Sequence, residues 1–143
     1  MRDEFFLVDT SAWILALRKD YLPAVRDRID QLLGENAVFT TGMVKLELLG
    51  GTKTEDEFRR LKNRLDALDG IMGDDSLWDK AGELSFQLRR KGCTVPYTDI
   101  LIAACALSAE CTLIHADGHF DLMAGRVGLK VESFVKAARR HTR

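Results

Sequence analysis

The sequence predicts an α/β sandwich built on a parallel sheet. Short, continuously apolar runs alternate along the chain with longer segments whose apolar residues recur at helical spacing. This alternation is typical of parallel strands joined by right-handed crossovers through helices. The chain has 143 residues, which is enough for a sizeable core, so we expect a single domain over residues 1–143.

The first elements are a buried strand, a short helix, a longer helix and a second strand. Residues 5–8 (Phe-Phe-Leu-Val) are apolar throughout, as expected of a strand that is covered on both faces. Residues 11–17 form a short helix. Pro23 suits the first turn of the longer helix, and Gly34 is expected to end it. Residues 37–40 give the second strand.

The middle of the chain is predicted to be mostly helical. Thr41 can cap a helix that stops at the glycine pair 50–51. Thr54 and Glu57 form the capping box of the next helix, whose apolar residues share one face. Residues 70–73 follow this helix and contain a weak strand.

The last part of the chain returns to the sheet. An amphipathic helix starts at Asp75 or Ser76. Thr98 or Asp99 is expected to cap the next helix, which is apolar nearly all round and therefore buried. Residues 111–115 form a clear strand. The two remaining elements are an edge strand over residues 129–132 and a basic terminal helix capped by Ser133.

The composition is ordinary for a soluble protein, with 46% apolar and 30% charged residues. The formal net charge is −1, so no global basic field indicates nucleic acid, although a local basic patch would serve an enzyme. No apolar run has the length of a membrane span or of a signal-peptide core, so we expect a cytoplasmic protein with no membrane partner. Three cysteines without C-x-x-C spacing indicate neither a disulfide framework nor a zinc site.

Four acidic residues lie where apolar segments end or helices begin: Asp9, Glu47, Asp99 and Asp117. Strand ends and helix starts meet at one edge of a parallel sheet, where open α/β folds place their sites. Carboxylates that gather there repel one another and resist desolvation unless a divalent cation neutralises them. Their hard oxygen atoms would select Mg²⁺ or Mn²⁺.

Each of these carboxylates also has a purely structural interpretation. Asp9, or Thr10 beside it, can cap the following helix, and Asp99 can cap its own helix. Asp117 can belong to a simple turn, and Glu47 can face solvent on an amphipathic helix. What distinguishes the set is that the four acids follow one another in the order Asp–Glu–Asp–Asp, each at a strand end or helix start of one short α/β chain.

Four segments carry a resemblance to a known family. They are residues 8–14 (VDTSAWI), 44–48 (VKLEL), 98–104 (TDILIAA) and 112–120 (TLIHADGHF). With these motifs in this order, the whole chain resembles the PIN-domain ribonucleases, and more closely the VapC-type toxins of toxin–antitoxin pairs. The resemblance implies a three-layer α/β/α sandwich with a twisted, mainly parallel sheet. It also implies a metal-dependent endoribonuclease that leaves 5′-phosphate and 3′-hydroxyl ends.

The family pattern gives each acidic residue of this sequence a role in an Mg²⁺- or Mn²⁺-dependent reaction. Asp9 and Asp99 match its most consistent metal ligands. Glu47 matches a helix glutamate that binds the metal directly or through water. Asp117 matches a fourth acidic position that is often tied to a second metal, and Ser11 matches a supporting hydroxyl that helps to hold Asp9.

Two histidines flank Asp117 in the sequence. His115 stands where relatives often carry Thr or Ser, and we expect it to be a packed or capped histidine. His115 and His119 have H-x-x-x-H spacing, but the residues between them suggest a turn and no H-E-x-x-H motif is present, so a zinc hydrolase is not expected. Asp121 lies one turn beyond Asp117 and is expected to face solvent.

The resemblance also implies partners. The expected substrate is RNA, with transfer RNA as the first candidate. Toxins of this type are usually homodimers, and a small antitoxin blocks them by approaching the acidic pocket.

Three alternatives from other classes remain open from the sequence. A phosphatase with an aspartyl nucleophile also begins with an apolar strand that ends in Asp, but it expects a second acid where Ser11 stands. A receiver-like domain also binds Mg²⁺ at strand ends, but it expects paired acids early in the chain and a lysine after a late strand. A non-catalytic binding module would have no physical reason to keep four carboxylates together.

Overall fold

The computed structural model describes residues 4–141 and contains a five-stranded sheet in the order β3-β2-β1-β4-β5. Residues 1–3 and 142–143 of the expected domain lie outside the described residues. Every strand pairing is parallel, which confirms the predicted fold class. The strands are β1 (Phe6–Val8), β2 (Val38–Thr41), β3 (Asp69–Ile71), β4 (Thr112–His115) and β5 (Val131–Ser133).

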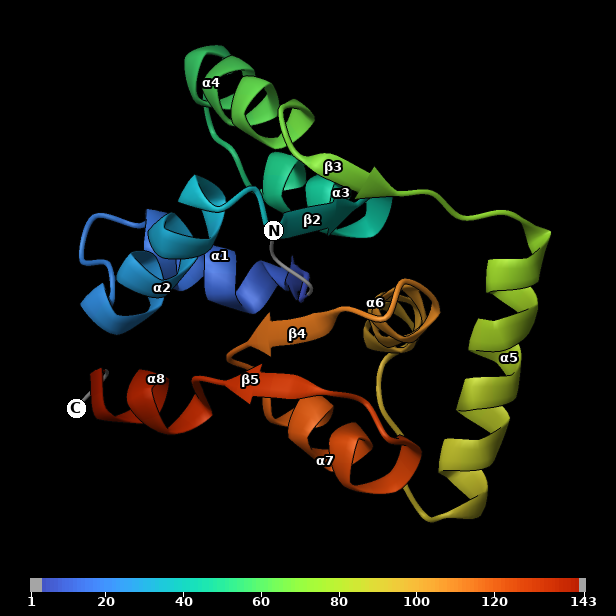
Figure 1. Ribbon diagram of the computed structural model, residues 1–143. Helices are drawn as coiled ribbons and strands as arrows, with labels where there is room; N and C mark the ends of the chain where they lie inside the picture. The colour runs from blue at the N-terminus through green and yellow to red at the C-terminus, as the bar shows by residue number, and fades with distance from the viewer. Residues whose placement is uncertain (1–3, 142–143) are drawn as a thin grey trace.

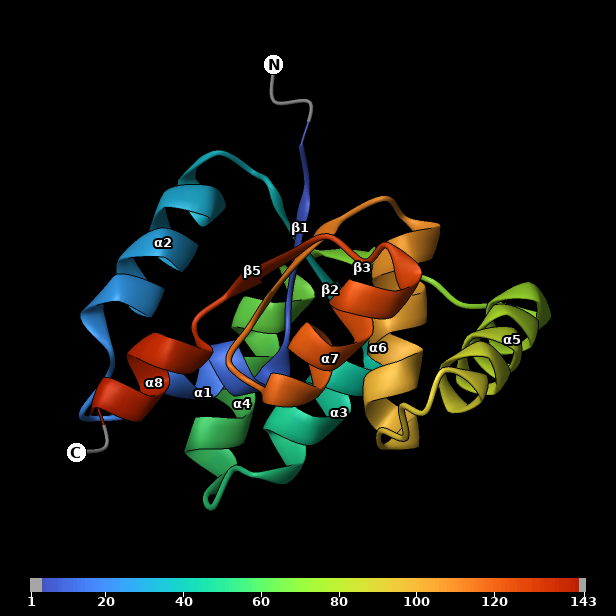
Figure 2. The ribbon, with the colours of Figure 1, turned by 90° about the horizontal axis from the view of Figure 1, so that it is seen from below.

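Helices cover both faces of this sheet. Figure 1 shows α1 and α2 on one side and α5 and α6 on the other, and the view from below in Figure 2 agrees. Helix α7 packs against α5 and α6, and α4 packs against α3. No helix among residues 4–141 is both long and apolar enough to cross a bilayer. The helices are α1 (Thr10–Leu17), α2 (Pro23–Gly34), α3 (Gly42–Gly50), α4 (Glu55–Asp66), α5 (Asp75–Arg90), α6 (Tyr97–Ser108), α7 (Gly118–Val127) and α8 (Val135–His141).

The strand order places a topological switch between β1 and β4. The chain runs outward from β1 through β2 to β3 and then returns beside β1 to form β4 and β5. Val8, the last residue of β1, pairs in register with Ile114 of β4, and Asp9 N–H donates to Ile114 C=O at 2.9 Å. Loops after adjacent strands diverge at such a point and leave a crevice, so the residues after β1 and β4 face a common site.

The core lies around the two central strands. Phe6, Leu7 and Val8 are buried on both faces, as are Leu113 and Ile114. This explains their uninterrupted apolar runs, because a parallel strand between two helical layers has no solvent face. Helix α6 is buried on most of its surface, as its sequence predicts. The three cysteines are free and buried.

Helix α7 was not predicted from the sequence. The Asp117-Gly118 pair resembles a turn, but it begins a helix in which Phe120 and Met123, three residues apart, are fully buried. Asp117 caps this helix by accepting from His119 N–H at 2.9 Å. Gly128 ends it with φ 71°, a left-handed conformation that suits glycine.

The predicted cap of α6 was wrong. The helix begins at Tyr97 directly after Pro96, so Thr98 and Asp99 both lie inside the first turn, and the N-terminus has no side-chain cap. Proline suits a helix start because it lacks the amide hydrogen that would be unsatisfied there. The Asp99 side chain is therefore not used as a cap and is available to the crevice at the switch point.

Candidate metal centre

Asp9 connects β1 to α1 and is nearly inaccessible, with 4% of its surface exposed. Its Oδ2 atom accepts two hydrogen bonds from Ser11, one from the backbone N–H at 3.0 Å and one from Oγ at 2.5 Å. Asp9 thus acts as the helix cap that its position predicts.

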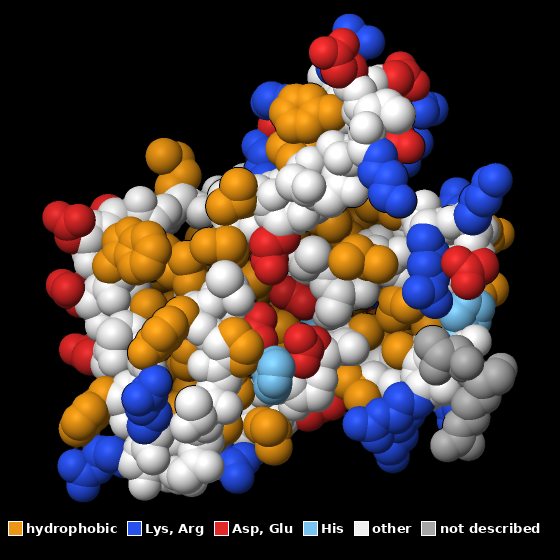
Figure 3. All heavy atoms as spheres, turned by 180° about the vertical axis from the view of Figure 1, so that it is seen from behind, with side chains coloured by type: hydrophobic (Ala, Val, Ile, Leu, Met, Phe, Trp, Pro, Cys, Tyr) orange, Lys and Arg blue, Asp and Glu red, His pale blue; other side chains and the backbone are white. Residues whose placement is uncertain are grey.

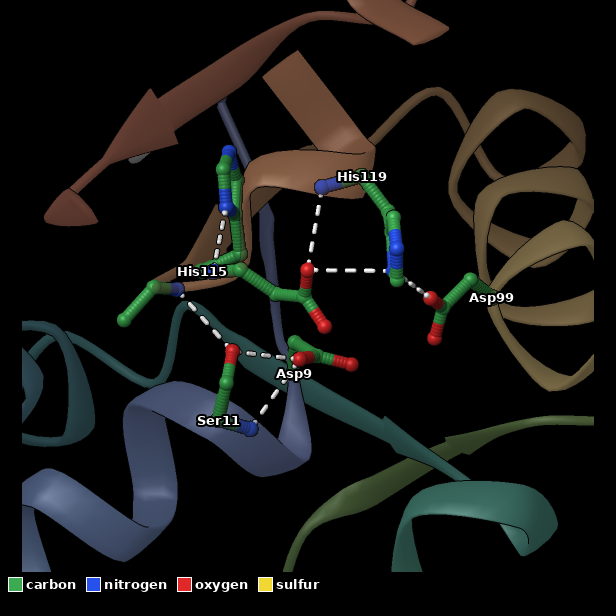
Figure 4. Close-up of polar contacts among 7 residues, drawn as sticks. Asp9, Ser11, Asp99, His115 and His119 are labelled. Carbon is green, nitrogen blue, oxygen red and sulfur yellow. Dashed lines mark hydrogen bonds and ion pairs between the residues drawn. The ribbon is translucent and has the colours of Figure 1, made fainter. Parts of the chain in front are cut away.

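Ser11 joins the two central strand ends. While its Oγ donates to Asp9, the same atom accepts from Ala116 N–H at 2.9 Å, in the loop after β4. Figure 4 shows these bonds side by side with the acidic groups above them. The hydroxyl therefore fixes the spacing between Asp9 and the segment that carries Asp117.

Asp99, Asp117 and His119 form a compact cluster across the N-terminal turns of α6 and α7. His119 Nδ1 lies 2.9 Å from Asp99 Oδ2 and 3.2 Å from Asp117 Oδ1. One ligand atom from each residue lies within 4.8 Å of the others. The positive ends of two helix dipoles face this cluster and favour its negative charge.

Glu47 reaches the site from α3. Thr10 Oγ1 donates to Glu47 Oε1 at 2.9 Å and links the start of α1 to α3. Glu47 is exposed to solvent, as expected if it lies on the polar face of an amphipathic helix. Its charge nevertheless raises the pKa of both Asp9 and Asp99. Charge interactions therefore link all four predicted acids, but only Asp99 and Asp117 belong, with His119, to the group whose ligand atoms lie within 4.8 Å of one another. Asp9 lies beside this group, and Glu47 lies at the rim of the site. Figure 3 shows acidic side chains and one histidine gathered in a hollow on one face of the molecule.

Burial and mutual repulsion act on the two least exposed carboxylates. Burial raises the pKa of Asp9 from 3.8 to about 6 against the opposing hydrogen bonds from Ser11, and the charges of Asp99 and Glu47 raise it further. Burial also raises the pKa of Asp99, and the charge of Asp117 raises it further. The hydrogen bond from His119 acts in the opposite direction and lowers this pKa. In the absence of a cation, ionising these groups therefore opposes folding.

His115 and Asp121 hold the backbone of the turn that carries Asp117. His115 is fully buried, so it is packed as expected, and its Nδ1 accepts from Asp117 N–H at 3.2 Å. Its Nε2 lies 3.2 Å from Asp121 Oδ1, while Asp121 Oδ2 accepts from Ser133 Oγ at 2.9 Å. Burial lowers the pKa of His115, which favours the neutral ring. Asp121 is exposed, as predicted, but it serves His115 and does not join the acidic cluster.

His119 is the site residue that sequence reasoning missed. The sequence suggested a role for His119 only as the partner of His115 in an H-x-x-x-H pair, but the His115 ring is buried and bonded to the backbone of the turn. The usable signal was instead the spacing of Asp117 and His119 at a helix start, because a capping side chain accepts from the backbone N–H two residues further along and so lies beside that residue. Because α7 was not predicted, the position of His119 at a helix start was not recognised.

The donor set fits a divalent cation. Carboxylate oxygens from three helix starts and one helix interior converge, and hard oxygen ligands suit Mg²⁺ or Mn²⁺. The charges that act most strongly on buried Asp9 are those of Asp99 and Glu47, and both oppose its ionisation. A bound cation would offset this repulsion.

Comparisons with known proteins agree on one family. The family model described as the PIN domain matches residues 6–126. Ribonuclease VapC21 of Mycobacterium tuberculosis is 31% identical over 130 residues, which cover 89% of this chain and 91% of that protein. Ribonuclease VapC11 of the same species is 31% identical over 133 residues, which cover 90% and 98% of the two chains.

A solved structure shows the same fold. The crystal structure of VapBC2 from Rickettsia felis, bound to a DNA fragment from their promoter, superposes with a TM-score of 0.75. The match covers 90% of this chain and 98% of that one at 22% sequence identity. This likeness supports the three-layer arrangement of helices around the sheet.

Proposed function

Because this chain belongs to the PIN-domain family and, within it, to the VapC ribonucleases, we propose that its acidic centre hydrolyses RNA with Mg²⁺ or Mn²⁺. The enzyme is an endoribonuclease and the toxin of a toxin–antitoxin pair. Transfer RNA is the first substrate to test, and the expected site of action is the cytoplasm. The domain is expected to extend over all of residues 1–143.

One observation carries this proposal. Carboxylates from four separate segments converge at the switch point between β1 and β4, although burial and repulsion oppose their ionisation. A fold that only needed helix caps would have no reason to place Glu47, which caps nothing, beside them. A cation explains the whole set, because it turns mutual repulsion into shared coordination.

Each residue has a distinct role in the proposed reaction. Asp9 and Asp99 hold the cation, and Glu47 binds it directly or through water. Asp117 completes the set and serves a second cation if one binds. Ser11 orients Asp9 through its two hydrogen bonds. A bound divalent cation lowers the pKa of a water molecule and offsets the charge of the phosphodiester.

The test is RNA cleavage by the purified protein with Mg²⁺ or Mn²⁺, compared with Asp9→Asn, Asp99→Asn and an EDTA control. We expect each variant to lower the cleavage rate by about 100-fold or more, since a metal ligand is lost. Asp79→Asn, an exposed acid on α5, is the matched control and should cleave normally. Cleavage that persists in EDTA, or product ends other than 5′-phosphate and 3′-hydroxyl, would contradict the proposal.

The geometry does not favour the aspartyl-phosphatase alternative. Such an enzyme needs a second acid two residues after its nucleophile, and here Ser11 holds that position with its hydroxyl bonded to both Asp9 and Ala116. A receiver-like domain needs a lysine after the late strand, where this chain has Ala116 and Asp117. A covalent phosphate on Asp9 would revive the first alternative.

A groove between α1, α2 and α4 supports an antitoxin partner. Its volume is about 520 Å³, and most of its lining is apolar, including Trp13, Leu17 and Leu33, with Arg64 at its side. We propose that an antitoxin segment places apolar side chains in this groove and an acidic one against Arg64. Leu17→Glu should weaken antitoxin binding and leave RNA cleavage by the free enzyme intact. Equal inhibition of this variant and the parent by antitoxin would count against the groove.

Exposed aromatic side chains on α5 support the proposed homodimer. Trp78 is 62% and Phe86 61% exposed, and they lie two turns apart on the helix. Two large apolar side chains exposed on the same helix offer a place for a protein contact. We propose that a second copy of this chain covers them.

A further inference from the structure

The histidine in the acidic cluster has the geometry of a ligand. Its Nδ1 lies 2.9 Å from Asp99 Oδ2 and 3.2 Å from Asp117 Oδ1. Two ligand atoms at right angles on a cation, each bonded at about 2.1 Å, are about 3.0 Å apart. The two separations are those of hydrogen bonds in the metal-free site, and they also match the spacing of neighbouring ligands on one cation.

The rest of His119 is arranged to hold Nδ1 in this place. The backbone N–H of His119 donates to Asp117 Oδ1 at 2.9 Å and fixes the residue at the start of α7. Figure 4 shows the His119 ring directed from α7 toward Asp99 on α6. The Nε2 atom has no hydrogen-bond partner among residues 4–141 and is free to carry the ring proton. In the metal-free site Nδ1–H donates to Asp99. A cation bound between the carboxylates would take the place of this proton, and the neutral ring would then carry its proton on Nε2 and direct the Nδ1 lone pair at the cation.

We propose that His119 Nδ1 is a ligand of the cation held by Asp99 and Asp117, and that it makes the centre prefer Mn²⁺ to Mg²⁺. Imidazole nitrogen binds first-row transition metals well, whereas Mg²⁺ strongly prefers oxygen ligands. An all-carboxylate centre would show much less discrimination. The inference rests on the proposed metal centre and is independent of the RNA substrate.

The first test is pulsed electron paramagnetic resonance of Mn²⁺ bound to the full-length protein without RNA. Directly bound ¹⁴N modulates the spin echo, and we expect this modulation in the parent protein. We expect it to disappear in His119→Asp, which replaces the nitrogen by an oxygen ligand. His141→Gln is the matched control, because His141 lies on α8 and contacts the backbone carbonyl of Asp20, so this variant should keep the modulation.

The second test is calorimetric titration of the same proteins with Mn²⁺ and Mg²⁺. His119→Asp should reduce the preference for Mn²⁺ over Mg²⁺ by about tenfold, with Mg²⁺ binding retained. Mn²⁺ bound by the parent without nitrogen modulation would overturn the role of His119 and leave the metal centre standing. An absence of Mn²⁺ binding would overturn both. The parent spectrum decides the question even if the variant fails to fold.

Discussion

Ser11 Oγ donates to Asp9 Oδ2 at 2.5 Å and so holds the most deeply buried acid of the site from the first turn of α1. The same oxygen accepts from Ala116 N–H at 2.9 Å. One hydroxyl therefore ties the end of β1 to the end of β4 at the point where the chain reverses its direction across the sheet. Both the stability of this edge and the position of Asp9 depend on it.

Replacing Ser11 by Ala should lower both the stability of the protein and its affinity for the metal. The free energy of unfolding should fall by about 1–3 kcal/mol, because Ala116 N–H and Asp9 each lose a partly buried partner. Metal affinity should fall by about tenfold, since Asp9 is no longer oriented. Urea unfolding and metal titration measure the two effects. Ser85→Ala on α5 is the control, and an equal loss in that variant would remove the special role of Ser11.

Asp9→Asn should stabilise the metal-free protein at neutral pH. The folded-state pKa of Asp9 is raised from 3.8 to about 6, so its stabilising contribution is present below pH 3.8 and is lost as pH rises through about 6. At about 1.4 kcal/mol for each tenfold change in the ionisation constant, the loss amounts to about 3 kcal/mol at pH 7.5. Asn keeps an acceptor for Ser11 but carries no charge, so the variant avoids this loss.

The measurement is chemical unfolding of both proteins in EDTA between pH 4 and pH 8. The advantage of Asp9→Asn should grow from near zero at pH 4 to its full value above pH 7. Adding Mn²⁺ should reverse the order, because the cation stabilises only a protein that binds it. A difference that does not change with pH would show that Asp9 ionises normally.

The sequence predicted the parts of the fold that local chemistry determines. The apolar runs at Phe6–Val8 and Thr112–His115 could only be strands between two layers, and Pro23, Thr41 and Thr54 mark helix starts at or within one residue of the observed ones. Helix α7 escaped because Asp117-Gly118 satisfies a turn equally well. Only tertiary contacts, which bury Phe120 and Met123, decide in favour of a helix.

The site was predictable as far as it depends on strand ends and family motifs. Asp9 and Asp117 follow adjacent strands, so their placement at one edge of the sheet follows from the strand order, which only the structure gives. The contact between His119 and Asp99 was not predictable, because it depends on how the first turns of α6 and α7 face each other. No local pattern encodes that angle.

The paired charges of Arg28 and Glu132 should stabilise the edge of the sheet. Arg28 on α2 donates from Nε to Glu132 Oε2 at 2.8 Å and from Nη2 to Oε1 at 3.0 Å, a two-bond pair that fastens β5. Glu132→Gln should lower the free energy of unfolding by about 1 kcal/mol, because two-bond geometry makes this pair stronger than most surface pairs. Asp56→Asn, which breaks the more exposed pair with Arg60, should change it by less than about 0.5 kcal/mol. Equal effects would show that geometry adds nothing here.

Replacing the exposed aromatic residues of α5 by charged ones should dissociate the proposed homodimer. A stable dimer buries roughly 800 Å² on each partner, and large aromatic side chains such as Trp78 and Phe86 supply much of the binding energy. The double variant Trp78→Glu, Phe86→Glu should be monomeric at concentrations where the parent is dimeric, because desolvating two carboxylates is unfavourable. Phe58→Glu, an exposed aromatic position on α4, should leave the dimer intact. Light scattering coupled to size exclusion gives the mass directly. A parent protein that is monomeric at high concentration, or a double variant that stays dimeric, would place the partner surface elsewhere.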